Sequence, residues 1–117
     1  MRIKKLSEDH VIEVIKTGEF SPDVTASNKK VVIILTQDWC PDWKNMQAWL
    51  DSLDATIDLD ICELIYNKSE HFQNCLELKE NRWNNRLIPY LRYYANGVLI
   101  HESNYVSKEE FLKILNL

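Results

Sequence analysis

Apolar residues follow one another without interruption from Val31 to Leu35, and all but the last of them are β-branched. Such a run is typical of a strand that is buried on both of its faces. The polar turn that follows ends in Cys40 and Pro41, and proline is tolerated at the first position of a helix. Apolar residues then recur at helical spacing, at Met46, Trp49, Leu50 and Leu53. The pattern therefore predicts a central strand, a tight turn and a helix that begins directly after Cys40.

Two further elements are predicted before the central strand. Ile3 and Leu6, which are flanked by basic residues, indicate a short edge strand. Ser7 is a good N-cap, and Gly18 is a suitable residue to end the helix that Ser7 begins. One face of that helix is expected to contain Val11, Ile12 and Ile15. Residues 19–30 have the composition of a loop.

After the central helix, the run from Leu59 to Tyr66 predicts a second strand. Asn67 is followed three residues later by Glu70, a spacing that predicts the start of a helix. The Asn84-Asn85 pair is expected to end that helix. Along one side, the helix would carry Phe72, Cys75, Leu76 and Trp83.

A β-hairpin is predicted in the last part of the chain. Ile88-Pro89-Tyr90 opens a run from Leu91 to Ala95, and Asn96-Gly97 is a strong signal for a two-residue hairpin turn. The second strand continues over Val98 to Ile100. A capping box from Ser107 to Glu110 then precedes a final amphipathic helix.

The order of these elements is βαβαβα, followed by a hairpin and a helix. Strand-helix-strand units require parallel pairing, and a hairpin adds antiparallel strands. We therefore predict an α/β fold with a mixed four- to five-stranded sheet and helices on both faces. The length of 117 residues, without repeats or linkers, indicates one domain over residues 1–117.

The composition argues against several classes of function. The net charge is −4, from 14 basic and 18 acidic residues, which argues against nucleic-acid binding. No apolar run is long enough to span a membrane, and no signal peptide is evident. Three scattered cysteines are too few for a disulfide framework, so we expect a reducing cytoplasm.

Cys40 is the candidate for reactive chemistry. A cysteine at a strand-to-helix junction lies over unpaired amide groups and the positive end of the helix dipole, and both favour the reactive thiolate. The negative charges of Asp38 and Asp42 act against the thiolate. From the residues alone, two interpretations remain open, a reactive nucleophile and an inherited cysteine in a scaffold that binds partners.

Other residues of interest also have two interpretations. Trp43 lies on the face of Met46 and is expected to fill the volume beneath the motif, or else to join Trp39 in a binding surface. Cys62 and Cys75 are expected to be small buried residues, although either is a candidate to resolve a disulfide at Cys40. No metal site is expected, because the only candidate spacing joins two ligands, His71 and Cys75.

The element order, with Trp39-Cys40 at a strand-to-helix junction and Ile88-Pro89 before the hairpin, resembles the thioredoxin family over nearly the whole chain. The motif is most similar to small thioredoxin-related proteins with the run Trp-Cys-Pro-Asp-Cys. The resemblance implies a thioredoxin-like fold, Cys40 as nucleophile, Pro89 as a cis-proline facing the thiol, and no cofactor. It also implies a substrate groove formed by Trp39, Pro41, Asp42, Trp43, Ile88 and Pro89.

Three positions depart from the family pattern. Trp43 stands in the place of the resolving cysteine, which excludes a disulfide within the motif. Ile34 stands in the place of the family's buried acid, and Ser103-Asn104 in the region where a glycine is expected.

These departures leave two main hypotheses. The first is single-thiol exchange through Cys40, in which mixed disulfides with protein thiols or glutathione are cleared by a separate thiol. The second is a redox-inactive module that binds a protein or peptide in the groove beside Pro89. A peroxide-sensing thiol is a weaker third hypothesis, because no residue in the motif is placed to polarise a peroxide.

Overall fold

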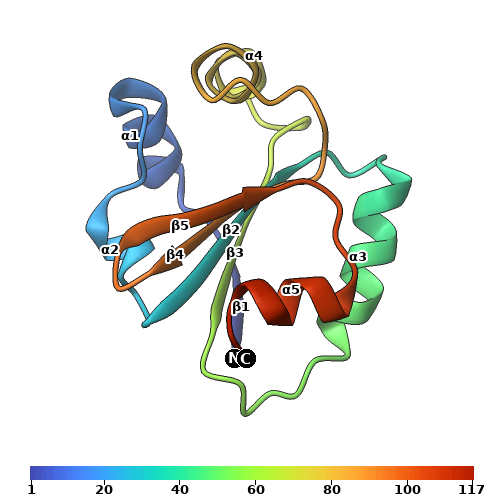
Figure 1. Cartoon of the computed structure of the whole chain (residues 1–117). Helices are drawn as coiled ribbons and strands as arrows, with labels where there is room; N and C mark the ends of the chain where they lie inside the picture. Colours follow the sequence, from blue (N-terminus) through green and yellow to red (C-terminus); the bar gives the residue numbers. More distant parts are fainter.

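The computed structural model describes residues 1–117, and a five-stranded sheet lies at its centre (Figure 1). The strands are β1 (Arg2–Lys5), β2 (Lys30–Thr36), β3 (Asp60–Ile65), β4 (Tyr90–Ala95) and β5 (Val98–Ser103). Their order across the sheet is β1-β3-β2-β4-β5. The first three strands are parallel, while β4 and β5 run antiparallel to their neighbours. The predicted mixed sheet is therefore confirmed, and the predicted central strand is β2.

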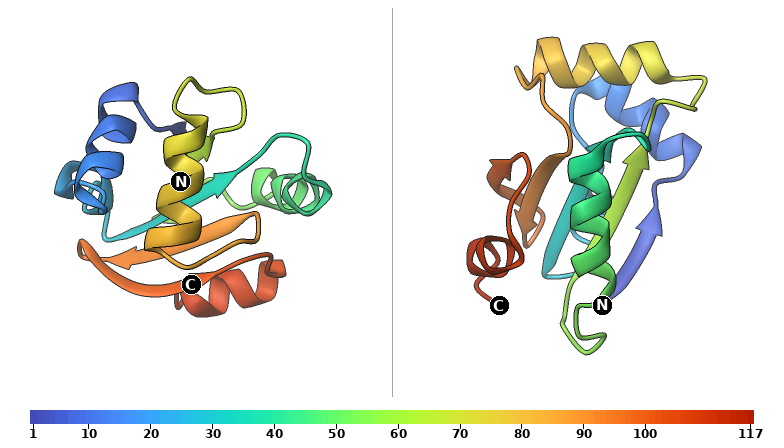
Figure 2. Two further views of the ribbon diagram at one scale, coloured as in Figure 1. Left: turned by 90° about the horizontal axis from the view of Figure 1, so that it is seen from above. Right: turned by 90° about the vertical axis from the view of Figure 1, so that its right-hand side faces the viewer.

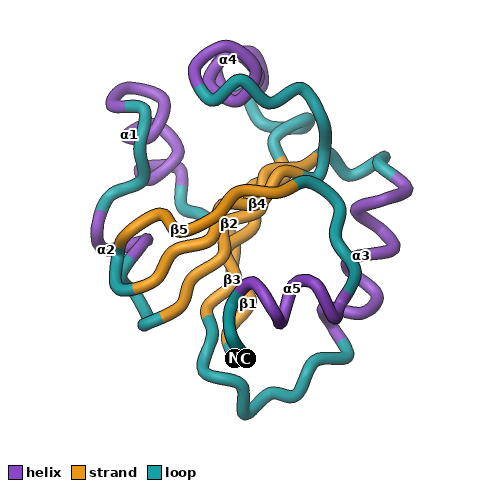
Figure 3. Tube along the Cα trace, in the orientation of Figure 1, coloured by secondary structure: helices purple, strands orange, loops and turns teal.

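Helices cover both faces of this sheet, as predicted (Figures 2 and 3). They are α1 (Glu8–Thr17), α2 (Pro22–Thr25), α3 (Pro41–Asp51), α4 (Phe72–Glu77) with the π-helical turn η1 (Leu78–Arg82), and α5 (Lys108–Ile114). α1 and α4 pack on one face, and α3 and α5 pack on the other. None of the helices has both the length and the apolar content that a membrane crossing requires.

The strand β2 is buried on both faces, which explains its continuous apolar run. Val31, Ile33 and Leu35 belong to the apolar cluster beneath α1 and α4. Val32 and Ile34 belong to the cluster beneath α3 and α5. Successive side chains of a strand point to opposite faces, so a strand between two layers of helices needs apolar residues at every position.

The predicted helix caps and hairpin turn are confirmed. The side chain of Ser7 accepts a hydrogen bond from the backbone at the start of α1, and Ser107 does the same for α5. Gly18 ends α1 with φ at 85°, in the left-handed region that glycine tolerates. Asn96 and Gly97 both have positive φ, at 51° and 80°, as a type I′ hairpin turn requires.

Two expectations near the amino terminus are wrong in detail. Residues 19–30 are not a continuous loop, because Pro22 starts the short helix α2, which buries Val24. The buried face of α1 is formed by Val11 and Val14, while Ile12 is exposed. Ile15 is partly buried and packs against the same cluster, as expected.

The predicted helix start at Asn67 is also wrong. The helix α4 begins at Phe72, with His71 as its N-cap residue. The side chain of Asn67 instead makes two hydrogen bonds with Asp38, in the turn that precedes Cys40. Asparagine is suited to caps and to turns alike, and a partner distant in the sequence decided its role here.

Asp60 fixes the edge strand β1 to β3. Its carboxylate is almost completely buried and accepts hydrogen bonds from Arg2, at 2.6 and 3.1 Å, and from Ser27, at 2.7 Å. Burial raises the pKa of Asp60, but the hydrogen bonds from Arg2, Ser27 and Asn28 outweigh burial and hold that pKa below its usual value. The ionised carboxylate therefore stabilises the folded state.

We expect Asp60→Asn to lower the free energy of unfolding by about 1–3 kcal/mol at pH 7, because charged hydrogen bonds are lost. The folded-state pKa lies below the unfolded value of about 3.9, so this contribution is present above about pH 4. It is lost as the pH falls through the folded-state pKa. Urea unfolding at pH 7 and pH 3 measures the difference, with Asp58→Asn at an exposed carboxylate as control. An equal loss at both pH values would contradict the assignment.

Candidate functional site

Cys40 lies at the junction between β2 and α3. It is the N-cap residue of α3, and Pro41 occupies the first helical position, as predicted. The backbone carbonyl of Cys40 accepts the first hydrogen bond of the helix, from the N–H of Lys44 at 3.1 Å. Only 4% of Cys40 is exposed, because its side chain turns into the apolar cluster beneath α3 and α5. The thiol is thus at a helix start but largely covered.

The loop that contains Pro89 lies against this thiol. β2 and β4 pair in antiparallel register, with Leu35 opposite Tyr90, so the end of β2 and the start of β4 are neighbours. The Ile88–Pro89 peptide bond, directly before β4, is cis. The Sγ of Cys40 donates a hydrogen bond to the carbonyl of Ile88 at 3.7 Å. The two motifs singled out in the sequence therefore meet.

Hydrogen bonds from neighbouring segments fix the turn before Cys40. The indole N–H of Trp39 donates to the side chain of Gln37 at 2.7 Å, while 59% of Trp39 remains exposed. Asp38 is tied to Asn67 by two hydrogen bonds and to Lys68 by an ion pair at 2.9 Å. Lys68 and then Asn67 hold the pKa of the Asp38 carboxyl below its usual range. The turn therefore presents an exposed indole and a carboxylate that stays ionised at neutral pH.

The predicted groove residues divide into exposed and buried sets. Pro41 and Asp42 are exposed beside Trp39, whereas Pro89 is buried and Ile88 is partly buried. Trp43 is only 2% exposed and belongs to the same apolar cluster as Ile34 and Cys40. Its burial supports the packing interpretation, so Trp43 fills the space beneath the motif and offers no surface to a substrate.

Cys62 and Cys75 lie on the other side of the sheet from Cys40. Both are fully buried in the cluster beneath α1 and α4, and all three cysteines are free thiols. Burial raises the pKa of Cys62 and that of Cys75 to about 11 each. The sheet therefore separates Cys40 from both possible resolving thiols, and the packing expectation for them is confirmed.

The spacing of His71 and Cys75 does not produce a shared ligand site. Cys75 points into the core, while Nε2 of His71 lies 3.3 Å from a carboxylate oxygen of Glu8 and 3.8 Å from one of Glu70. His71 therefore joins the start of α1 to the loop before α4. That no metal is bound by this chain stays a prediction.

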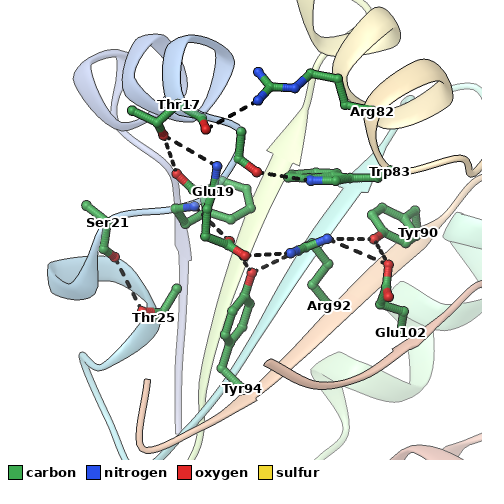
Figure 4. A network of polar contacts seen from close by, with 12 residues as sticks. Thr17, Glu19, Ser21, Thr25, Arg82, Trp83, Tyr90, Arg92, Tyr94 and Glu102 are labelled. Carbon is green, nitrogen blue, oxygen red and sulfur yellow. Dashed lines mark hydrogen bonds and ion pairs between the residues drawn. The ribbon is translucent and has the colours of Figure 1, made fainter. Parts of the chain in front are cut away.

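A buried arginine anchors the strand that follows Pro89, and the sequence reasoning missed it (Figure 4). Arg92 lies over the ring of Trp83, with 4.1 Å between its guanidinium carbon and the ring centroid. It donates hydrogen bonds to the hydroxyls of Tyr90 and Tyr94, at 3.0 and 2.8 Å, and pairs with Glu19 at 2.7 Å. Burial raises the pKa values of both tyrosines. The alternation of Tyr90, Arg92 and Tyr94 was the available signal for a shared face.

Two asparagines that the sequence did not single out as site residues brace the Pro89 loop. Asn104 follows β5 directly and donates to the backbone carbonyls of Leu87 and Pro89. Its side chain also pairs with that of Asn85. The only sequence signal was that Ser103-Asn104 stands where the resemblance places a glycine.

Comparison with solved structures identifies the fold. Thioredoxin O1 from Arabidopsis thaliana matches with a TM-score of 0.70 and 13% identity, over 97% of this chain and 95% of its own. Thioredoxin f2 from Chlamydomonas reinhardtii has a TM-score of 0.68 and 19% identity, over 97% and 94%. The short form of thioredoxin f from spinach chloroplast has a TM-score of 0.66 and 16% identity, over 97% and 90%.

These matches show that the chain has the thioredoxin fold, as the sequence predicted. At such low identity, the similarity extends to the fold and not to an activity. No protein-family model matches the chain, and no curated protein sequence matches it significantly.

The two tryptophans of the motif are expected to differ in their effect on stability. Trp43→Ala removes a buried ring and is expected to lower the free energy of unfolding by about 3–5 kcal/mol. Trp39→Ala removes an exposed ring and is expected to change it by about 0.5 kcal/mol or less. Urea unfolding of the two variants measures both values, and similar losses would contradict this placement.

Cys62 and Cys75 are expected to resist alkylation in the native protein. With pKa values near 11, only about 1% of each is thiolate at pH 9. Iodoacetamide followed by peptide mapping is expected to modify Cys40 first at pH 9, and all three cysteines in urea. If Cys62 or Cys75 were modified in the native protein as fast as Cys40, the core around them would be accessible to the reagent, which would contradict this prediction.

Proposed function

We propose that this chain performs single-thiol disulfide exchange through Cys40. The Cys40 thiolate attacks one sulfur of a disulfide, forms a mixed disulfide with it and releases the other sulfur as a thiolate. A separate thiol, such as glutathione, then attacks the mixed disulfide, regenerates the Cys40 thiol and leaves with the substrate sulfur in a new disulfide. Electrons and sulfur atoms balance without a cofactor.

The observation that carries this proposal is the contact between the Cys40 thiol and Ile88, next to Pro89. Ile88 O is 3.7 Å from Sγ, and the N–H of Ile88 makes no hydrogen bond within the chain. An extended peptide pairs with a free N–H and carbonyl in the same way as an added strand. Deprotonation of Cys40 releases the carbonyl of Ile88, which leaves both backbone groups for a substrate peptide beside the thiolate.

Exposed apolar side chains flank this contact. Trp39, in the turn before Cys40, is 59% exposed, and Leu87, in the loop before β4, is 65% exposed. Large exposed apolar side chains beside a reactive group are suited to contact a protein partner. This supports protein disulfides as substrates. In our proposal glutathione is the small thiol that clears them, in the reducing cytoplasm that we expected from the sequence.

Resolution of the mixed disulfide must be external under this proposal. Trp43 occupies the place of a second motif thiol, and Cys62 and Cys75 lie across the sheet from Cys40. A disulfide requires Cα atoms within about 7 Å, which a side chain on the opposite face does not reach without unfolding. The mixed disulfide is therefore expected to accumulate until an outside thiol is added.

The low exposure of Cys40 favours a second function, the binding of a protein or peptide without exchange. A thiol that is 4% exposed and hydrogen-bonded to a carbonyl is poorly placed for attack until the loop moves. In this alternative, Trp39 and the backbone of Ile88 hold the partner, and Cys40 is a packing residue.

Glutathione disulfide distinguishes the two functions. The exchange proposal predicts one glutathione adduct per chain by intact mass spectrometry, its location at Cys40 by peptide mapping, and its removal by reduced glutathione. Cys40→Ser is expected to abolish the adduct, while Cys75→Ser is expected to keep it. Absence of an adduct on the wild-type chain, with partner binding unaffected by Cys40→Ser, would leave the binding function in its place.

A further inference from the structure

The side-chain amide of Asn104 lies between two backbone carbonyls of the Pro89 loop. Its Nδ2 is 3.2 Å from the carbonyl oxygen of Leu87 and 3.1 Å from that of Pro89. These two residues are the immediate neighbours of Ile88, whose own carbonyl accepts a hydrogen bond from the Cys40 thiol. One side chain thus holds the backbone on both sides of the residue that contacts the thiol.

Asn85 completes a closed pair with Asn104. Its Nδ2 donates to Oδ1 of Asn104 at 3.0 Å, and its Oδ1 lies 2.9 Å from Nδ2 of Asn104, whose two hydrogens are shared among this oxygen and the two backbone carbonyls. The same Oδ1 accepts from the backbone N–H of Leu87 at 3.1 Å. Because Nδ2 of Asn104 faces two carbonyl oxygens, the orientation of both amides follows from the backbone. Leu87 is therefore held at both its N–H and its carbonyl.

A buried lysine fixes Asn85 in turn. Nζ of Lys79, in η1, donates to the backbone carbonyl of Asn85 at 2.8 Å, and Asn85 N–H donates to the carbonyl of Lys79 at 3.0 Å. The side chain of Lys79 is fully buried. A buried ammonium is costly unless it is hydrogen-bonded, so this contact is held firmly. Contacts thus run from the core beneath α4 to the loop at the thiol.

We infer that Asn104 is a positioning residue that aims the backbone of Ile88 at Cys40. This inference rests on the proposed exchange function for its role with peptide substrates. We call the two hydrogen bonds from Asn104 to the carbonyls of Leu87 and Pro89 the brace. With the brace, the Ile88 carbonyl covers the thiol, and the Ile88 N–H keeps the direction that a peptide needs. Without it, the loop moves away from the thiol, which becomes easier for a small reagent to reach and less able to exchange with a peptide.

Two rates measured on the full chain test this inference. The first is alkylation of Cys40 by iodoacetamide, which requires only access to the thiol. The second is exchange of Cys40 with a short extended peptide whose cysteine is disulfide-bonded to glutathione, which also requires Ile88 to be in place. We expect Asn104→Ala to raise the first rate and lower the second, each by about five- to tenfold, as the loss of one or two hydrogen bonds would give.

Three further variants make the result specific. Asn104→Asp keeps the acceptor for Asn85 but loses the donors to both carbonyls, so it is expected to act as Asn104→Ala does. Asn85→Asp keeps the acceptor for Leu87 and is expected to have a smaller effect. Asn74→Ala removes an exposed asparagine without a side-chain hydrogen bond, and both of its rates are expected to match those of the wild type.

Opposite changes in the two rates support the positioning role, because partial unfolding would raise both. Changes in the same direction, no change, or wild-type rates for Asn104→Asp would overturn it. If the wild-type chain does not exchange with the peptide at all, the proposed function fails, and alkylation alone decides on the brace. In that case, unchanged alkylation in Asn104→Ala overturns the brace, and faster alkylation at an unchanged melting temperature supports it.

Discussion

The antiparallel pairing of β2 with β4 is the contact on which the candidate site depends. Cys40 and Pro89 are far apart in the sequence, and each lies just outside one of these two strands. The register that places Leu35 opposite Tyr90 makes the end of one strand adjacent to the start of the other. A shift of one residue would turn every side chain of β4 to the opposite face and remove the contact. Burial of β2 and β4 between two layers of helices excludes such a shift.

The sheet also divides the chain into two chemically different halves. The layer beneath α3 and α5 contains Cys40 and the indole of Trp43. The layer beneath α1 and α4 contains the other two thiols and the buried cation of Arg92. The hydrogen-bonded strands between them permit no passage of side chains. Any chemistry at Cys40 is therefore that of one thiol and whatever approaches it from solvent.

The parts of the structure that local patterns control could be predicted from the sequence. The continuous apolar run of β2, the caps at Ser7 and Ser107, and the Asn96-Gly97 turn each depend on neighbours within a few residues. The order of these elements predicted the mixed sheet, and the resemblance to the thioredoxin family implied the thioredoxin fold and the meeting of Cys40 with Pro89. Even the start of α3 at Pro41 required only the fixed φ of proline and the spacing of the apolar residues behind it.

The polar contacts that finish the site could not be predicted in this way. Asn67 has the composition of a helix cap, yet it bonds to Asp38, and nothing within a few residues of Asn104 indicates that it reaches the Pro89 loop. Asparagine suits caps, turns and side-chain pairs equally well, so its partner is decided only after the backbone is in place. The low exposure of Cys40 was unpredictable for the same reason, because it depends on packing beneath α3 and α5 and on a carbonyl from a distant loop.

The pairing of Arg92 with Glu19 has a consequence for which substitutions this sequence can accept during evolution. Loss of Glu19 alone would leave the guanidinium with only the more distant carboxylate of Glu102, at 3.6 Å, and loss of Arg92 alone would leave two tyrosine hydroxyls short of a donor. The side chain of Arg92 is 4% exposed and that of Glu19 is 48% exposed, so the guanidinium is the charge that is costly to leave without a partner. Substitutions at positions 19 and 92 are thus expected to be correlated among related sequences. An alignment would show this correlation, although the two positions are 73 residues apart in the chain.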